Sequence, residues 1–306
     1  MIGSTRYTAS VEIQRQTSLA AEISKLQQSV SSNKRLTAAS DDPKAAARIA
    51  DIRQNQADNT VWKRNADIGA GIAASADTAL KSLSSLTQRA KELIIAGAND
   101  TNANLNRTQI AAELRSIAGE ITALSQSKDP NGQPLFPTGD PLQIPVSNGR
   151  SLPATASATE VFGTVKTAQG DRSMVDILNN AAAALELGPD AKLPYTDADG
   201  NTTDADGNPL EWTQTEALAA SVAAIGNADD HVLSVQTDQG IRAQRFDTEK
   251  ASLSSGGDDM TVERSSLEDT DLTYAVAAYQ AKSLSLQAAQ TMFAQTHKNS
   301  LFDLIG

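Results

Sequence analysis

Residues 267–306 read LEDTDLTYAVAAYQAKSLSLQAAQTMFAQTHKNSLFDLIG, and their pattern decides the fold. After an acidic start at residues 268–271, apolar side chains recur at alternating steps of four and three. The row comprises Leu272, Val276, Tyr279, Leu286 and Phe293, with Ser283 and Gln290 filling its gaps. Such spacing is typical of a coiled-coil seam. Because a lone helix cannot bury so narrow a stripe against itself, the pattern predicts a partner helix.

The predicted partner lies at the other end of the chain, in residues 11–30. Two adjacent apolar rows run along this segment, and they comprise Ile13, Ala20, Ile23 and Val30, and Leu19, Ile23, Leu26 and Val30. Both terminal segments are therefore expected to be regular helices, although chain ends are commonly frayed. Periodicity leaves two alternatives open: the helices close a bundle within one monomer, or they pair with each other and with neighbouring subunits.

Composition excludes several kinds of function. The chain of 306 residues has no Cys, so disulfides, thiolate metal sites and Cys nucleophiles are excluded. Its two His, His231 and His297, are far apart in sequence, and we expect no metal site and no cofactor. A net charge of −11 argues against nucleic-acid binding, and no basic helix suits a membrane surface. No nucleophile–base pair or paired carboxylates stand out, so we expect no enzyme.

Targeting signals are also missing from the pattern. Residues 1–7, MIGSTRY, lack the charged and apolar regions of a cleaved signal peptide, and no apolar run approaches a membrane span. Taken alone, these features predict a cytoplasmic protein. They are equally compatible with export by a route that reads no cleaved signal.

Helix signals dominate the N-terminal half. Asp42 is placed to cap a helix whose first residue is Pro43, because proline lacks an N–H that would be unsatisfied there. That helix is expected to reach about residue 98, with a turn at 100–102 and a third helix over about 104–127. Short connections of this kind predict antiparallel neighbours.

The middle of the chain changes character. A tight turn is expected at Asn131-Gly132, a hairpin over 142–152, a strand at 160–163 and a short helix over 174–187. The loop 194–211 contains DADGN twice, and two readings are open: a calcium loop, or two solvated Asx turns. Against calcium, Thr202 stands where the turn needs glycine and Asn208 where a bidentate Glu is needed.

From residue 212 helix is expected again, to about residue 264, with a hinge at Gly256-Gly257 before the last helix. The predicted fold is mainly α: an elongated rod of long antiparallel helices, the N- and C-terminal helices paired as a coiled coil, plus a small β-containing middle insertion. The predicted domains are a terminal coiled coil, a helical rod and a variable insertion; they comprise 1–40 with 267–306, 41–135 with 212–266, and 136–211.

Three stretches resemble the flagellin superfamily. They are LQQSVSSNKRLTAASDDPKAAAR at 26–48, the helix pattern from Asn65 to Leu80, and QRAKEL followed by ANDT over 88–101. Within the superfamily, SDDP at 40–43, the NGxxxF segment at 131–136 and the ending NSLFDL at 299–304 are most similar to hook–filament junction proteins of the hook-associated protein 3 type. The resemblance adds Leu301, Phe302 and Leu304 to the expected terminal interface.

The resemblance implies an extracellular axial structure of the bacterial flagellum, with terminal helices that line an inner tube. It implies export, unfolded, through the flagellar type III apparatus without a cleaved signal, after binding to a cytoplasmic chaperone. The implied partners are a hook-side junction protein, flagellin and further copies of this chain, with no nucleic acid and no membrane. Because the terminal seams lack a buried partner in a monomer, we expect them to order on assembly.

Two other functions stay open. The chain could be a flagellin that polymerises into filament, or a surface flagellin homologue whose insertion binds a ligand such as polysaccharide. In some flagellins an innate immune receptor contacts the outer-domain surface, and Gln88, Arg89, Leu93 and Glu113 occupy matching positions; packing is the simpler role for them.

Overall fold

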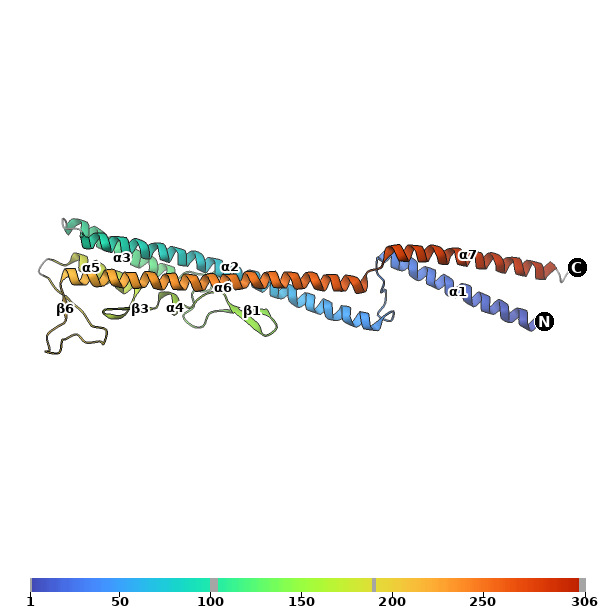
Figure 1. Ribbon diagram of the computed structural model, residues 1–306, viewed down its shortest axis with the longest axis horizontal. Coiled ribbons are helices and arrows are strands. Elements are labelled where there is room, and N and C mark those ends of the chain that lie inside the picture. Colours follow the sequence, from blue (N-terminus) through green and yellow to red (C-terminus); the bar gives the residue numbers. More distant parts are fainter. Residues whose placement is uncertain (1, 100–103, 189–190, 303–306) are drawn as a thin grey trace. The chain divides into compact units, whose positions relative to one another are not determined.

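The computed structural model describes residues 2–99, 104–188 and 191–302 (Figure 1). Within these ranges the chain is mainly helical and carries three small antiparallel strand pairs, which confirms the predicted fold class. The elements are α1 Ile2–Ser32, α2 Pro43–Asn99, α3 Asn104–Ser125, β1 Gln143–Ser147, β2 Arg150–Pro153, α4 Ala158–Phe162, β3 Thr164–Thr167, β4 Gly170–Ser173, α5 Met174–Glu186, β5 Leu193–Pro194, β6 Glu211–Trp212, α6 Gln214–Glu268 and α7 Leu272–Phe302.

Contacts group the chain into two units. The first unit combines Met1–Asn59 with Ser255–Gly306, and the second is Thr60–Ser254. The three domains predicted from the sequence stay a prediction, since these units are groupings by contact alone. The predicted extents of α2, α3 and α5 agree with the structure to within two residues. The turn predicted at 100–102 lies outside the described residues.

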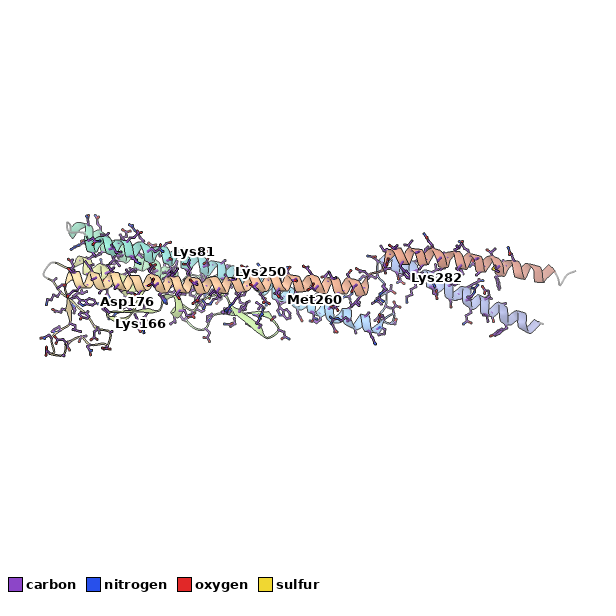
Figure 2. The ribbon with its side chains drawn as sticks, in the orientation of Figure 1. Lys81, Lys166, Asp176, Lys250, Met260 and Lys282 are labelled. Carbon is purple, nitrogen blue, oxygen red and sulfur yellow. The ribbon has the colours of Figure 1, made fainter. Side chains whose placement is uncertain are left out.

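The first unit pairs the two ends of the chain. Helices α1 and α7 run antiparallel, because Glu22 forms an ion pair with Lys282 while Gln27, further along α1, bonds Tyr279, earlier on α7. Figure 2 shows Lys282 projecting from α7. The start of α2 and the end of α6 are antiparallel too, joined by Arg48–Glu263 and related pairs. The predicted pairing of the terminal helices is present in the structure.

The second unit holds the larger hydrophobic core. Helices α2, α3, α5 and α6 bury side chains that are all at most 2% exposed, including Leu80, Leu83, Ile94, Leu114, Leu178, Leu185, Ile225 and Phe246. Gly69 on α2 lies directly against the Phe246 ring of α6, so the two helices can approach closely there. Gln239 is fully buried and donates to the Ala73 and Ala154 carbonyls, which ties α6 to α2 and to the segment after β2.

The strand pairs cover one stretch of this unit. β1 and β2 form the predicted hairpin, and Gly149 at its turn has φ +75°, a conformation that favours glycine. β3 pairs with β4 and β5 with β6. Gly132 also has a positive φ, and its N–H bonds the Asp129 carbonyl, which confirms the predicted turn there.

The strand predicted at 160–163 is wrong, because most of this stretch belongs to helix α4 and the strand β3 starts at Thr164. Ser157 Oγ accepts from the Glu160 N–H at 3.1 Å, and Glu160 Oε2 accepts from the Ser157 N–H at 2.7 Å. This reciprocal pair is a capping box, readable in the sequence as Ser-x-x-Glu. It starts a helix despite the β-favouring Val161 and Phe162.

The hinge predicted at Gly256-Gly257 is also wrong, because α6 continues through both glycines to Glu268. The helix there packs on α2, where a side-chain carbon at Gly257 would lie 3.4 Å from Asn59 Oδ1. The break before α7 lies instead at residues 269–271. Asp271 caps α7, since its carboxylate accepts from the Tyr274 N–H at 3.0 Å.

Of the two readings of the loop 194–211, the geometry matches the Asx turns. Asp197 Oδ1 accepts from the N–H groups of Asp199 and Asn201, and Asp204 repeats the pattern seven residues later. The amide side chains of Asn201 and Asn208 also donate to these carboxylates, at 3.0 Å each. The amide bonds are the largest cause that lowers the pKa of Asp197 and of Asp204, and the backbone N–H bonds add to it.

Candidate subunit interface

The terminal pair has a seam of buried and half-buried side chains. On α1 it runs through Leu19, Ile23, Leu26 and Val30, all half-buried and all predicted as interface residues. On α7 it runs through Ala275, Tyr279, Lys282, Leu286, Ala289 and Phe293, again at steps of four and three. The burial pattern of both helices therefore follows the predicted heptad spacing.

The seam on α7 is rotated from the predicted one. Tyr279, Leu286 and Phe293 belong to both, but Leu272 and Val276 are 45% and 39% exposed. On α1, Ile13 is 54% exposed. Leu301 and Phe302 lie in α7 with side chains outside the described set, and Leu304 lies outside the described residues.

Small residues are the most buried ones in α1 and α7. Among the side chains described in these two helices, the buried ones are Ser29, Ala275 and Ala289. The predicted interface does not include these positions, because the prediction rests on large apolar residues and Ala and Ser are small. Their spacing, with Ala275 and Ala289 two heptads apart, was the available signal.

The terminal pair leaves much apolar surface uncovered. Each of the ten predicted interface side chains described in α1 and α7 is half-buried or exposed. Further large apolar side chains are exposed by about half or more, namely Tyr7, Val11, Tyr274, Leu284 and Met292. Many exposed apolar side chains on one pair of helices are typical of a surface that contacts other proteins. Pairing α1 with α7 therefore does not bury all the apolar side chains of either helix.

The base of the pair is fixed by polar contacts. Glu268 is buried and accepts from Lys34 Nζ at 2.6 Å and from Arg53 at 2.8 Å, and Arg264 lies 3.7 Å away. The hydrogen bond from Lys34 is the main cause that lowers the pKa of Glu268. The Arg35 N–H also bonds the Glu268 carbonyl at 2.8 Å. The segment after α1 is thus tied to the end of α6.

The segment before α2 is ordered by two carboxylates. α2 begins at Pro43, and Asp42 Oδ1 accepts from the Ala45 N–H at 3.1 Å, which is the geometry of a helix cap. Asp41 accepts from Lys25 Nζ at 2.8 Å and from the Ala38 N–H at 3.1 Å. The Lys25 bond is the largest cause that lowers the pKa of Asp41.

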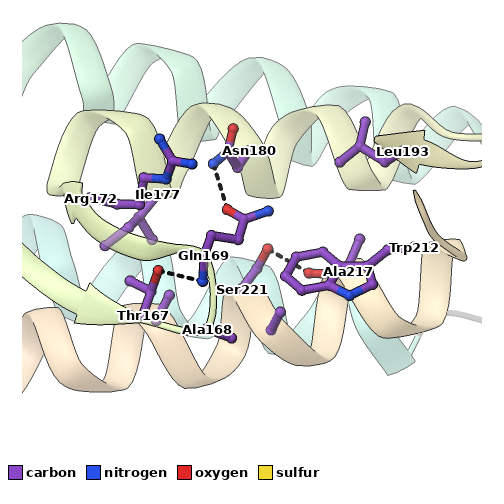
Figure 3. Close-up of a pocket in the computed structure, with 12 residues that line it drawn as sticks. Thr167, Ala168, Gln169, Arg172, Ile177, Asn180, Leu193, Trp212, Ala217 and Ser221 are labelled. Atoms are coloured by element: carbon purple, nitrogen blue, oxygen red, sulfur yellow. Dashed lines mark hydrogen bonds between the residues drawn. The ribbon is translucent and has the colours of Figure 1, made fainter. Parts of the chain in front are cut away.

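A small cavity of the second unit lies near β4 and β6, shown in Figure 3. Its volume is about 20 Å³, room for about one water molecule, whereas ligand pockets measure hundreds of Å³. Asn180 donates to Gln169 Oε1 at 3.1 Å on its wall. The cavity is therefore too small for a sugar, and the ligand-binding alternative gains no support from it.

Metal binding, membrane insertion and the histidine His231 are three further points of chemical interest in the part of the chain that the structure describes. There, no three or more His, Cys, Asp or Glu side chains are grouped to hold a metal ion. Each helix of that part is too short or too polar to cross a membrane. His231 is half-buried on α6, and its Nε2 has no hydrogen-bond partner among the described residues.

The receptor-matching residues take part in packing. Arg89 Nε donates to Glu113 Oε1 at 2.9 Å, which joins α2 to α3, and Leu93 is 7% exposed in the core. The bond to Glu113 is the main cause that raises the pKa of Arg89. Gln88 bonds Ser84 on its own helix.

Comparisons with known proteins agree with this structural reading. Residues 4–138 match the family described as the bacterial flagellin N-terminal helical region. Flagellar hook-associated protein 3 from Escherichia coli (strain K12) is 25% identical over 301 residues, which covers 93% of each chain. Flagellin from Bacillus subtilis (strain 168) is 25% identical over 88% of this chain and 87% of its own. Sequence identity alone therefore does not separate the two kinds of protein.

Solved structures extend the likeness to the fold. Flagellar hook-associated protein 3 from Legionella pneumophila superposes with a TM-score of 0.59 at 13% identity, and covers 72% of this chain and 98% of its own. The relatives are flagellar proteins, which supports a structural role in the flagellum. The predicted resemblance is confirmed: residues 4–138 match the bacterial flagellin N-terminal helical region, and the chain is similar over most of its length to flagellar hook-associated protein 3.

Proposed function

We propose that this chain is an extracellular component of the bacterial flagellum that joins a hook-side junction protein to filament flagellin. One observation carries the proposal: the paired terminal helices keep apolar side chains such as Ile13, Leu272 and Val276 at the surface. A helix pair that buries mainly Ala and Ser at its centre is suited to take up further helices from neighbouring copies.

Assembly then supplies the burial that the isolated chain lacks. In this proposal, the terminal helices order fully only when neighbouring subunits cover them, so folding is coupled to binding. The ordering cost delays self-assembly until a template is present. The chain would leave the cell through the flagellar type III apparatus, without a cleaved signal, after a cytoplasmic chaperone has covered its ends.

The proposal can be tested with purified protein and two kinds of seed. The protein is added to hook-terminated particles and to filament fragments, and both are viewed by electron microscopy. We expect a short layer at the hook end that stops growing. Attachment to neither seed would contradict the proposal.

The second candidate is a flagellin that polymerises into filament. The match to Bacillus subtilis flagellin over most of both chains favours it. The NSLFDL ending, which resembles junction proteins, favours the first candidate. In the same seed experiment, long filaments growing from the seeds would identify a flagellin.

A further inference from the structure

An open groove lies between the β1–β2 hairpin and helix α6 in the second unit. Its volume is about 580 Å³, and its walls include Arg150, Leu152, Ile241 and Arg245. Arg150 forms an ion pair with the buried Glu249, which neutralises one charge of each sign. Arg245 is exposed and has no hydrogen-bond or ion-pair partner among the described residues. The groove therefore offers one uncompensated cation beside apolar surface, in a chain of net charge −11.

An acidic loop with the opposite charge occupies residues 196–211. Its two Asx turns are held internally, since Asp197 and Asp204 accept backbone and amide hydrogens. The carboxylates of Asp199 and Asp206 are left exposed, without a hydrogen-bond or ion-pair partner in the described part of the chain. The bridge between Thr203 and Pro209 further fixes the second turn. The loop thus presents two free carboxylates on a preformed backbone.

The loop and the groove of one copy cannot meet. The loop ends at β6, immediately before α6 begins at Gln214, whereas Ile241 of the groove lies 27 residues further along the same continuous helix. At 1.5 Å per residue this separation is about 40 Å. Figure 1 shows the β6 loop and the β1 hairpin at opposite ends of the strand pairs along α6.

We propose that the acidic loop of one copy docks in the Arg245 groove of a second copy, displaced by about 40 Å along α6. This inference rests on the proposed function, in which copies of the chain assemble. Charge complementarity selects the occupant, because Asp199 and Asp206 are carboxylates that can form an ion pair with the unpaired Arg245. A desolvated carboxylate–guanidinium pair of this kind gives specificity. The middle insertion would then brace neighbouring copies outside the terminal helices.

Cross-linking between copies tests the contact directly, because the chain has no cysteine of its own. One preparation of the full chain carries Ala205→Cys, beside Asp206, and a second carries Gln244→Cys, beside Arg245. The two are mixed, assembled on hook-terminated seeds, and treated with a short bismaleimide. A control mixture replaces Gln244→Cys by Ser82→Cys, an exposed position on α2. Assembly is measured separately by sedimentation.

We expect an interchain product from the Ala205→Cys and Gln244→Cys mixture, with roughly fivefold less product in the Ser82→Cys control. Adding Arg245→Glu to the Gln244→Cys chain should remove the product, and adding Asp199→Lys and Asp206→Lys to the Ala205→Cys chain should restore it. Normal sedimentation without the product would overturn this inference and leave the proposed function standing. A product in which Gln244→Cys joins the hook protein instead would overturn it too. Loss of all sedimentation with the unsubstituted chain would overturn both.

Discussion

Lys34 Nζ lies 2.6 Å from the Glu268 carboxylate, so residues far apart in sequence meet at the base of the terminal helix pair. Lys34 follows α1 and Glu268 ends α6, and the isolated bridge between Lys34 and Asp269 continues the contact. Arg53 of α2 donates to the same oxygen at 2.8 Å. The contact therefore joins the segment after α1 to the end of α6 and to α2 within the first unit.

Glu268→Gln should destabilise this unit. The substitution removes a buried negative charge that balances Lys34 and Arg53, and it weakens two charge-assisted hydrogen bonds. Because both cations are about half exposed, the loss should be near 1–2 kcal/mol rather than the larger figure for a fully buried pair. Urea unfolding followed by circular dichroism measures the change.

Glu263→Gln is the matched control, since Glu263 pairs with Arg48 at an exposed position of the same helix. It should change the free energy of unfolding less than Glu268→Gln does. Equal effects of the two substitutions would show that burial of Glu268 adds nothing.

The stability of the first unit should fall in acid. The folded-state pKa of Glu268 is lowered from its ordinary value of 4.5, chiefly by Lys34, so its stabilising effect is present above pH 4.5. It is lost as the pH falls from 4.5 through the lowered pKa, because the unfolded chain then binds the proton more readily. The free energy of unfolding, measured at several values between pH 6 and pH 3, should decrease less steeply in Glu268→Gln than in the natural chain.

Gly69→Ala should destabilise the second unit by about 1–3 kcal/mol. A methyl group at Gly69 would overlap the Phe246 ring, which is fully buried and cannot swing into solvent. The expected result is a lower midpoint of thermal unfolding. Adding Phe246→Leu to the same chain should recover part of the loss.

Gly71→Ala is the control for this prediction. It lies two residues away on the same helix, is exposed, and would bring a methyl group within 4 Å of nothing. Because alanine favours helix over glycine, this change should stabilise by about 0.5–1 kcal/mol. If Gly71→Ala were also destabilising, this stretch of α2 would not tolerate alanine in general. The effect of Gly69→Ala could then not be assigned to the contact with Phe246.

Leu272→Ser with Val276→Ser should weaken assembly and spare the monomer. The two side chains are 45% and 39% exposed on α7, so a partner that covers them gains about 1 kcal/mol from each. Loss of both should raise the protein concentration needed for attachment to seeds by roughly tenfold or more. Sedimentation with seeds measures the concentration.

Ala277→Ser, on the same exposed stretch of α7, serves as the comparison because it removes little apolar area. It should leave seeded attachment nearly unchanged. If Leu272→Ser with Val276→Ser attached as well as the natural chain, the exposed row of α7 would not be an assembly surface.

Trimming the chain to residues 41–266 should remove little helix signal from the monomer in solution, since assembly supplies the partner of the terminal helices. Circular dichroism of the full and trimmed chains, both as monomers by light scattering, measures the difference. A loss in proportion to the lengths of α1 and α7 would contradict coupled folding and leave the adaptor role untouched.

The long helices were predictable because caps and heptads are local signals. Asp42-Pro43 marked the start of α2, and the steps of four and three marked α1 and α7. The hairpin at 142–152 was predictable from Asn148-Gly149. The helix α4 could have been predicted from Ser157 and Glu160, but β-favouring residues outweighed that signal.

Two features depend on tertiary contacts that a single sequence does not display. Gly256-Gly257 favours a break, yet packing of α6 on α2 keeps the helix continuous. The buried face of α7 is marked by Ala275 and Ala289, and not by all of its large apolar residues. Seam rotation of this kind exposes Leu272 and Val276, and the periodicity alone could not distinguish the two faces.

Order of addition tests the adaptor role most directly. Hook-terminated seeds are incubated with or without this protein, washed, and then given flagellin, and the fraction of seeds that carry a filament is counted by electron microscopy. The account predicts filaments on most seeds that received this protein first and on few of the others. Equal fractions in the two samples would contradict it.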